Sequence, residues 1–288
     1  MYEDILFPFD GSDSAAAILH HAAEIAHWCD ATIHVLFVAD TARDSVTVVE
    51  GQTVDALVRE GEDVVAEAAE TLRSLGAAHE TDVVQGNPAP TIAAYAERYG
   101  HDLVVMPTHG RSGVSRYLVG SVTEKVVRLS SVPVLTARMR PDDQLAFPYE
   151  DVLLPTDGST RANRAAEHGL ALAQTLGATA HLLSVVDDTP LGVDVRSTTM
   201  SSAVEGAARE AVEDLAAAAA ERGLEDVVQH VEHGRPVDAI LDCIDANGVD
   251  AVVMGTTGRR GTERVLLGSV AERTVRTAPV PVVTIGAE

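Results

Sequence analysis

The chain has 288 residues and a formal charge of −23, from 44 acidic and 21 basic side chains. At roughly 150 residues per domain, this length predicts two domains, each large enough to bury a core. The 46% hydrophobic content excludes a disordered polymer, and the apolar runs fall short of the ~18 residues that cross a bilayer. The acidic balance disfavours attraction to phosphates or anionic lipid, so we expect neither nucleic acid nor membrane as a partner.

The start of the chain and its cysteines predict a cytoplasmic protein. Met1–Asp4 is acidic where a secretory signal is basic, and no apolar segment with a cleavage site follows. Cys29 and Cys243 lie far apart with no C-x-x-C, which suits a reducing compartment and disfavours zinc.

The chain consists of two copies of one unit. Phe7–Ser12 (FPFDGS) returns as Leu154–Ser159 (LPTDGS). This spacing is that of whole domains and far exceeds a solenoid repeat. Arg140–Phe147 is polar and contains a proline, as a linker would. We therefore expect one domain at residues 1–140 and a second at 148–288.

In the first copy, short apolar runs alternate with helical patterns. Strands are expected at Ile5–Phe7, Ile33–Val38, Thr81–Val84, Leu103–Met106 and Val134–Ala137. Helices are expected where Ile18, Ala22, Ile25 and Cys29 keep a helical spacing, at Val54–Leu75, after Pro88 and near Gly120.

The second copy repeats this order. Strands are expected at Val152–Leu154, His181–Val186, Val227–Val231, Ala251–Met254 and Val282–Ile285. Helices are expected around Ala165–Leu176 and Ala203–Arg222, after Pro236 and near Gly268. Five strands alternating with four helices predict an α/β protein with two tandem, doubly wound, five-stranded parallel sheets and helices on both faces.

Ligands of such sheets bind beyond the carboxyl ends of the strands. There Gly255–Gly258, nine further residues and Gly268-Ser269 lead from a strand to a helix. This stretch offers bare amides, a hydroxyl and the positive end of a helix to a phosphate. Asp10 and Asp157 follow the first strands, where they either contact the same ligand or only cap the next helix.

The pattern G-x2-G-x9-G-[ST] after a hydrophobic strand, with P-x-D-G-S near the start of the copy, resembles the nucleotide-binding branch of the universal stress protein family. The resemblance covers both copies and implies a Rossmann-like fold of the adenine nucleotide alpha hydrolase type. It also implies a stress-response regulator that binds ATP, or AMP or ADP, with Mg²⁺ arriving on the phosphates. In the family, the strand-end Asp and a valine ending the second strand meet adenine or ribose, and the glycine motif holds the phosphates.

Carried over by position, the resemblance implies two sets of ligand-binding residues. Those of the second copy are Asp157, Val185, Gly255, Gly258, Gly268, Ser269 and Val270. Those of the first copy are Asp10, Val38, Gly110, Gly120, Ser121 and Val122. Pro107 stands where the motif has its first glycine, so we expect the first copy to fit less well.

We expect no catalytic residue and no metal ligand. His230 and His233 flank Glu232 closely, but residues three apart on a strand point to opposite faces. The sequence has no G-x4-G-K-[ST] loop, no G-x-S-x-G and no H-E-x-x-H. Two alternatives stay open: an interaction module of the same fold with empty pockets, and a slow ATPase.

The resemblance also bears on assembly. It implies that single-domain members dimerise through their last strands. We therefore expect the final strands of the two copies to pair as an intrachain pseudo-dimer, and a further homodimer stays open.

The charge balance predicts a dependence on salt. Only Lys125 among the 21 basic residues is a lysine, and this acidic, lysine-poor composition is typical of halophiles. We expect the melting temperature to rise between dilute buffer and molar KCl, because the screening length shrinks from roughly 30 Å at 0.01 M salt to about 3 Å at 1 M. A melting temperature that stays flat or falls over this range contradicts the halophilic interpretation.

Overall fold

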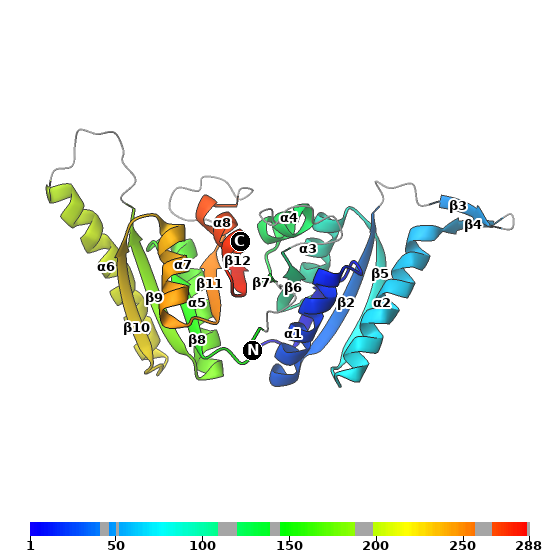
Figure 1. Cartoon of the computed structure of the whole chain (residues 1–288), viewed down its shortest axis with the longest axis horizontal. Coiled ribbons are helices and arrows are strands. Elements are labelled where there is room, and N and C mark those ends of the chain that lie inside the picture. Colours follow the sequence, from blue (N-terminus) through cyan, green and yellow to red (C-terminus); the bar gives the residue numbers. More distant parts are fainter. Residues whose placement is uncertain are drawn as a thin grey trace. The chain divides into compact units, whose positions relative to one another are not determined.

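The computed structural model describes residues 1–40, 46–49, 52–108, 120–138, 145–187, 198–256 and 267–286. The chain forms two compact units, Met1–Phe147 and Pro148–Glu288 (Figure 1). The boundary between them lies at the end of the segment that the sequence marks as a linker. Within the described ranges, no helix combines the length and the apolar character needed to span a membrane.

The first unit is a parallel sheet in the order β7-β6-β1-β2-β5. Its strands are β1 (Asp4–Pro8), β2 (Thr32–Asp40), β5 (His79–Gly86), β6 (Leu103–Pro107) and β7 (Val134–Ala137). Its helices are α1 (Asp13–Cys29), α2 (Ala56–Ser74), α3 (Pro88–Tyr99) and α4 (Ser121–Leu129). Helix α1 packs against α2, and α3 packs against α4, as expected for helix layers on both faces of the sheet.

The second unit repeats the first in the order β10-β9-β8-β11-β12. Its strands are β8 (Asp151–Pro155), β9 (Thr179–Val186), β10 (Val227–His233), β11 (Ala251–Gly255) and β12 (Val282–Ile285). Its helices are α5 (Thr160–Leu176), α6 (Thr198–Glu221), α7 (Pro236–Asn247) and α8 (Ser269–Thr277). The α/β fold class expected from the sequence is confirmed.

Burial explains why the apolar runs form central strands. Ile5, Leu6 and Phe7 of β1 are completely buried. In β8, Val152–Leu154 is buried in the same way. Strands covered on both faces need side chains that are apolar on both faces, so the alternation typical of a half-exposed strand is absent here.

An antiparallel hairpin departs from the sequence-based expectation. Strands β3 (Val46–Val49) and β4 (Gln52–Asp55) pair in the first unit, where we expected only a loop before the helix. Helix α2 consequently begins at Ala56 rather than Val54. Both short strands are rich in valine and threonine, whose branched Cβ favours extended backbone over helix.

The buried histidine of α1 predicts an acid-sensitive fold. The His21 side chain is only 2% exposed, and its burial lowers its pKa to about 4. Glu24 Oε2 lies 3.5 Å from His21 Nδ1, but this carboxylate is 54% exposed, so water screens it and burial dominates. Unfolded histidine has a pKa of about 6.5, so the folded state binds fewer protons below that pH. The stabilisation is complete above about pH 6.5 and is lost as the pH falls towards 4.

We therefore expect the free energy of unfolding to fall by about 3 kcal/mol between pH 7 and pH 4 through His21 alone. Urea titrations across this range measure the fall, and His21→Leu should flatten it. His20→Leu changes an exposed neighbour on the same helix and serves as the matched control. Equal acid dependence in the two variants would show that His21 is not the responsible group.

Candidate functional site

The candidate site of each unit lies where the strand order reverses. In the second unit, β8 pairs with β11 only through Val152 and Leu153, opposite Ala251 and Val252. On its other side, β8 stays paired with β9 as far as Pro155. The chain runs from β8 to β9 and β10 on one side and then crosses to β11 and β12 on the other, so the carboxyl ends of β8 and β11 form a topological switch point, the position at which open α/β sheets bind ligands. Strands β1 and β6 take the same places in the first unit.

Asp10 and Asp157 shape the turn from the first strand to the first helix. Asp10 Oδ1 accepts a hydrogen bond from the amide of Ser12 at 3.0 Å, and Asp157 Oδ1 accepts one from Ser159, also at 3.0 Å. Each serine is the N-cap, and its hydroxyl accepts from the amide three residues on at 3.2 Å. The capping role considered for the aspartates thus belongs to the serines, which sequence reasoning missed although the spacing suits an N-cap.

Val38 and Val185 lie near the carboxyl ends of β2 and β9, beside the first strand of each sheet. Both are partly exposed, in strands that are otherwise largely buried. The structure thus brings each valine to the same end of the sheet as Asp10 or Asp157.

The glycine-rich loops are closed at their bases by matching hydrogen bonds. The Gly120 amide donates to the carbonyl oxygen of Thr108 at 2.7 Å, and the Gly268 amide donates to that of Thr256 at 2.7 Å. Both threonines are buried, at 2% and 6% exposure. The residues expected inside these loops, Gly110 and Gly258, lie outside the described ranges, so their role stays a prediction.

Helices α4 and α8 begin with glycine N-caps. Gly120 and Gly268 have extended backbones and no side chain with which to cap the helix. Their first turns contain the remaining expected residues, which are Ser121, Val122, Ser269 and Val270. These first amides carry the positive end of the helix dipole without the side-chain acceptor that a serine cap would supply.

Gly255 and Pro107 are structural equivalents. Each ends its strand, Gly255 opposite Ile285 and Pro107 opposite Ala137. A Cβ added to Gly255 would lie 3.2 Å from the carbonyl oxygen of Arg161 in the first turn of α5, so glycine permits a close approach. Pro107 instead lacks an amide hydrogen. The two copies therefore differ at a point where a ligand would approach the strand end.

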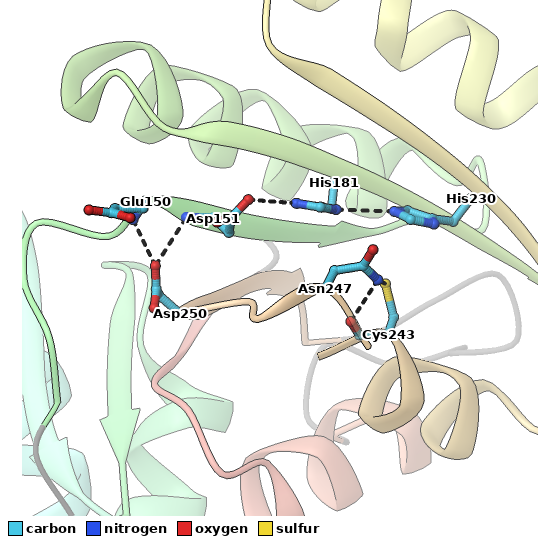
Figure 2. A network of polar contacts seen from close by, with 7 residues as sticks. All are labelled: Glu150, Asp151, His181, His230, Cys243, Asn247 and Asp250. Carbon is cyan, nitrogen blue, oxygen red and sulfur yellow. Dashed lines mark hydrogen bonds and ion pairs between the residues drawn. The ribbon is translucent and has the colours of Figure 1, made fainter. Parts of the chain in front are cut away.

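Sequence reasoning missed a second polar cluster, away from the carboxyl ends. Figure 2 shows Asp151, His181 and His230 hydrogen-bonded in a row across β8, β9 and β10. The signal was available in the repeat, because Asp4 and His34 of the first unit form the equivalent 2.8 Å contact. Within the described part of the chain, no group of three or more His, Cys, Asp or Glu residues is arranged to hold a metal ion.

Comparison with known proteins agrees with this architecture. The model of the Universal stress protein family matches residues 1–138 and 148–286. A universal stress protein of Methanocaldococcus jannaschii is 34% identical over 141 residues, 48% of this chain and 83% of that protein. One from Mycolicibacterium smegmatis is 28% identical over 301 residues, covering 98% of this chain and 96% of that protein.

A solved structure extends the likeness to the fold of the whole chain. The crystal structure of a universal stress protein from Archaeoglobus fulgidus has a TM-score of 0.72 and 24% identity, covering 98% of this chain and 96% of that one. The family model matches two ranges of the chain, and one of these ranges lies in each unit. This chain belongs to the universal stress protein family and carries two tandem copies of its domain.

Proposed function

We propose that this universal stress protein is a stress-response regulator that binds an adenine nucleotide at the carboxyl end of each sheet. The observation that supports this most is the repeated pair of features at each switch point. A glycine-capped helix follows the fourth strand, and an aspartate follows the first strand. Neither feature alone indicates a nucleotide, but together they supply partners for phosphate and for sugar.

Each proposed contact follows from the chemistry of the residue. The first amides of α4 and α8 donate to phosphate oxygens, and the Ser121 or Ser269 hydroxyl adds a donor. Asp10 and Asp157 accept hydrogen bonds from ribose hydroxyls. The amide of the following turn donates to each Oδ1 atom and so fixes the orientation of the carboxylate. Val38 or Val185 provides an apolar contact for adenine.

The nucleotide is proposed to be ATP, or AMP or ADP, with Mg²⁺ carried on the phosphates. Mg²⁺ gives up its water reluctantly, and nucleotide sites commonly hold it through the phosphates and few protein ligands. The amides at the glycine-capped helix ends suit phosphate oxygens, so the residues fit a phosphate-bound ligand. When present, the ion would neutralise phosphate charge in an otherwise acidic protein.

Nucleotide release tests the proposal directly. We expect full-length protein, purified gently and then denatured with acid, to release an adenine nucleotide that chromatography identifies. The double variant Gly120→Val, Gly268→Val should release none, because two Cβ-bearing side chains would crowd the proposed phosphate positions. Wild-type protein that releases no nucleotide and binds none in titration would instead favour the interaction module. Release of ADP after incubation with ATP would favour the slow ATPase.

The second unit should bind nucleotide more tightly than the first. Pro107 has no amide hydrogen and carries a ring, whereas Gly255 has neither restriction. Loss of one hydrogen bond to a charged phosphate costs about 1.5–3 kcal/mol, which corresponds to about tenfold or more in affinity. We therefore expect calorimetric titration to resolve a tight and a weak site.

Variants that change one unit at a time show which unit holds the tight nucleotide site and which holds the weak one. Gly268→Val should remove the tighter site, and the matched Gly120→Val should remove only the weaker one. Asp157→Ala and Asp10→Ala form a second matched pair. If the first-unit changes remove the tighter site, Pro107 does not weaken binding and the proposed asymmetry is wrong.

A further inference from the structure

The second unit contains a hydrogen-bonded row of three titratable side chains, Asp151, His181 and His230 (Figure 2). Asp151 Oδ1 lies 2.8 Å from His181 Nε2, and His181 Nδ1 lies 3.1 Å from His230 Nε2. The His181 side chain is 5% exposed, and the two imidazole rings stack at 5.4 Å. Asp151 begins β8, so this row lies away from the proposed nucleotide site, which follows the end of that strand.

The first hydrogen bond fixes where the protons lie. The Asp151 carboxylate can only accept, so His181 carries a hydrogen on Nε2. A neutral His181 then has a lone pair on Nδ1, and His230 donates its Nε2 hydrogen to it. Both hydrogen bonds are therefore complete while the two histidines are neutral.

The row tolerates one additional proton but not two. A proton on Nδ1 of His230 leaves its Nε2 hydrogen directed at His181 and makes that hydrogen bond charge-assisted. A second proton must go to Nδ1 of His181, which places two N–H groups against each other at the 3.1 Å contact. The doubly protonated pair also places two positive charges side by side, one of them on a buried ring.

The surroundings leave His230 open to protons from solvent. It lines a groove of about 380 Å³ between β10 and α7. The charged or titratable groups of this groove are Glu232 and His233 on β10, Arg235 before α7, and Asp238, Asp242 and Cys243 on α7. Burial raises the pKa of the Cys243 thiol, whose sulfur accepts from Asn247 Nδ2 at 3.4 Å, so the thiol stays neutral.

One acidic side chain, Asp250, holds Asp151 in place at the other end of the row. Asp250 Oδ2 accepts from the amides of Glu150 and Asp151 at 2.7 and 3.1 Å. Asp102 holds Glu3 and Asp4 in the same way in the first unit, at 2.8 and 3.1 Å. The carboxylate that anchors the first histidine therefore has a fixed backbone in both units.

The first unit keeps the anchored histidine, but its neighbour on the edge strand is a carboxylate and not an imidazole: Glu80 Oε2 of β5 lies 3.7 Å from His34 Nδ1. Asp82 pairs with Leu36 as His230 pairs with Leu183, so Asp82 occupies the position equivalent to His230. Asp82 Oδ2 accepts from the Tyr95 hydroxyl at 2.9 Å. Strand β5 is therefore a matched edge strand without the imidazole-to-imidazole hydrogen bond.

We propose that the Asp151–His181–His230 row is a proton switch that holds β10 on β9 at neutral pH and releases it when both histidines become protonated. The rest of the sheet stays in place, because only the edge strand β10 depends on this contact. The device responds below about pH 6.5, where histidines that are free of their folded surroundings become charged.

The direction of the effect follows from linkage. Burial and the neighbouring His181 lower the pKa of His230, against the smaller opposing effect of Glu232. When β10 separates from β9, His230 regains the pKa of about 6.5 of an unperturbed histidine. The hold on β10 is thus complete above about pH 6.5 and weakens as the pH falls below it.

Hydrogen exchange of the full-length protein tests the switch. Protection factors, which correct for the intrinsic pH dependence of exchange, are compared at pH 7.5 and 5.0 for the amides of β10 and β5. We expect β10 to lose on the order of tenfold more protection than β5, because linkage weakens only the hold on β10. His230→Asp copies the first unit and should abolish the difference. His233→Asp changes an exposed histidine on the same strand and should preserve it.

Ring NMR provides a second measurement on wild-type protein, in case His230→Asp does not fold. The nitrogen shifts should show His181 with its hydrogen on Nε2 at pH 7.5 and a single protonation of the pair before β10 opens. Equal loss of protection in β10 and β5 would overturn the proposal. Two fully protonated rings at pH 5 with β10 still protected would also overturn it.

Discussion

Parallel pairing of buried strands is the constraint on which the rest of each unit depends. Strands that all run in one direction must return through helices. Every strand-to-helix junction therefore lies at the carboxyl end of the strands. In the second unit this end collects Asp157, Thr256 and Gly268, which are far apart in sequence. The opposite end of the sheet collects Asp151, the first residue of β8, and Asp250, the residue before β11. Two kinds of polar cluster therefore arise from one rule of topology.

The first and the last helix of each unit start in two chemically different ways. Helices α1 and α5 have serine caps that use one of their own first amides, whereas α4 and α8 begin at glycines. A serine cap accepts a hydrogen bond from an amide of the first turn. A glycine cap has no side-chain acceptor, so an outside group can interact with the first amides and with the positive end of the helix dipole. Both kinds lie at the carboxyl edge, so the fold supplies rigid positions and the choice of cap residue decides which position can receive an anion. This division recurs in both copies.

Sequence patterns predicted the strands well because burial on both faces imposes continuous apolar runs such as Val152–Leu154. They also predicted that Asp10 and Gly120 share an edge, since topology alone requires it. The β3–β4 hairpin and the Asp151–His181 contact were not predicted. A hydrogen bond between residues 30 apart depends on strand register, which short-range spacing does not contain. The recurrence of Asp4 and His34 at the same spacing was the one usable signal.

The close approach at Gly255 also constrains how the two copies can diverge after duplication. Any other residue there brings a Cβ to within 3.2 Å of the Arg161 carbonyl oxygen, unless the first turn of α5 shifts. The first copy accommodates Pro107 and ties its carbonyl oxygen to the Thr123 hydroxyl at 2.9 Å, where the second copy has Ala271. Exchanging Gly255 and Pro107 between the two copies would therefore place each residue beside neighbours that do not match it. The strand end and the first turns of the adjoining helices therefore form one matched set in each copy.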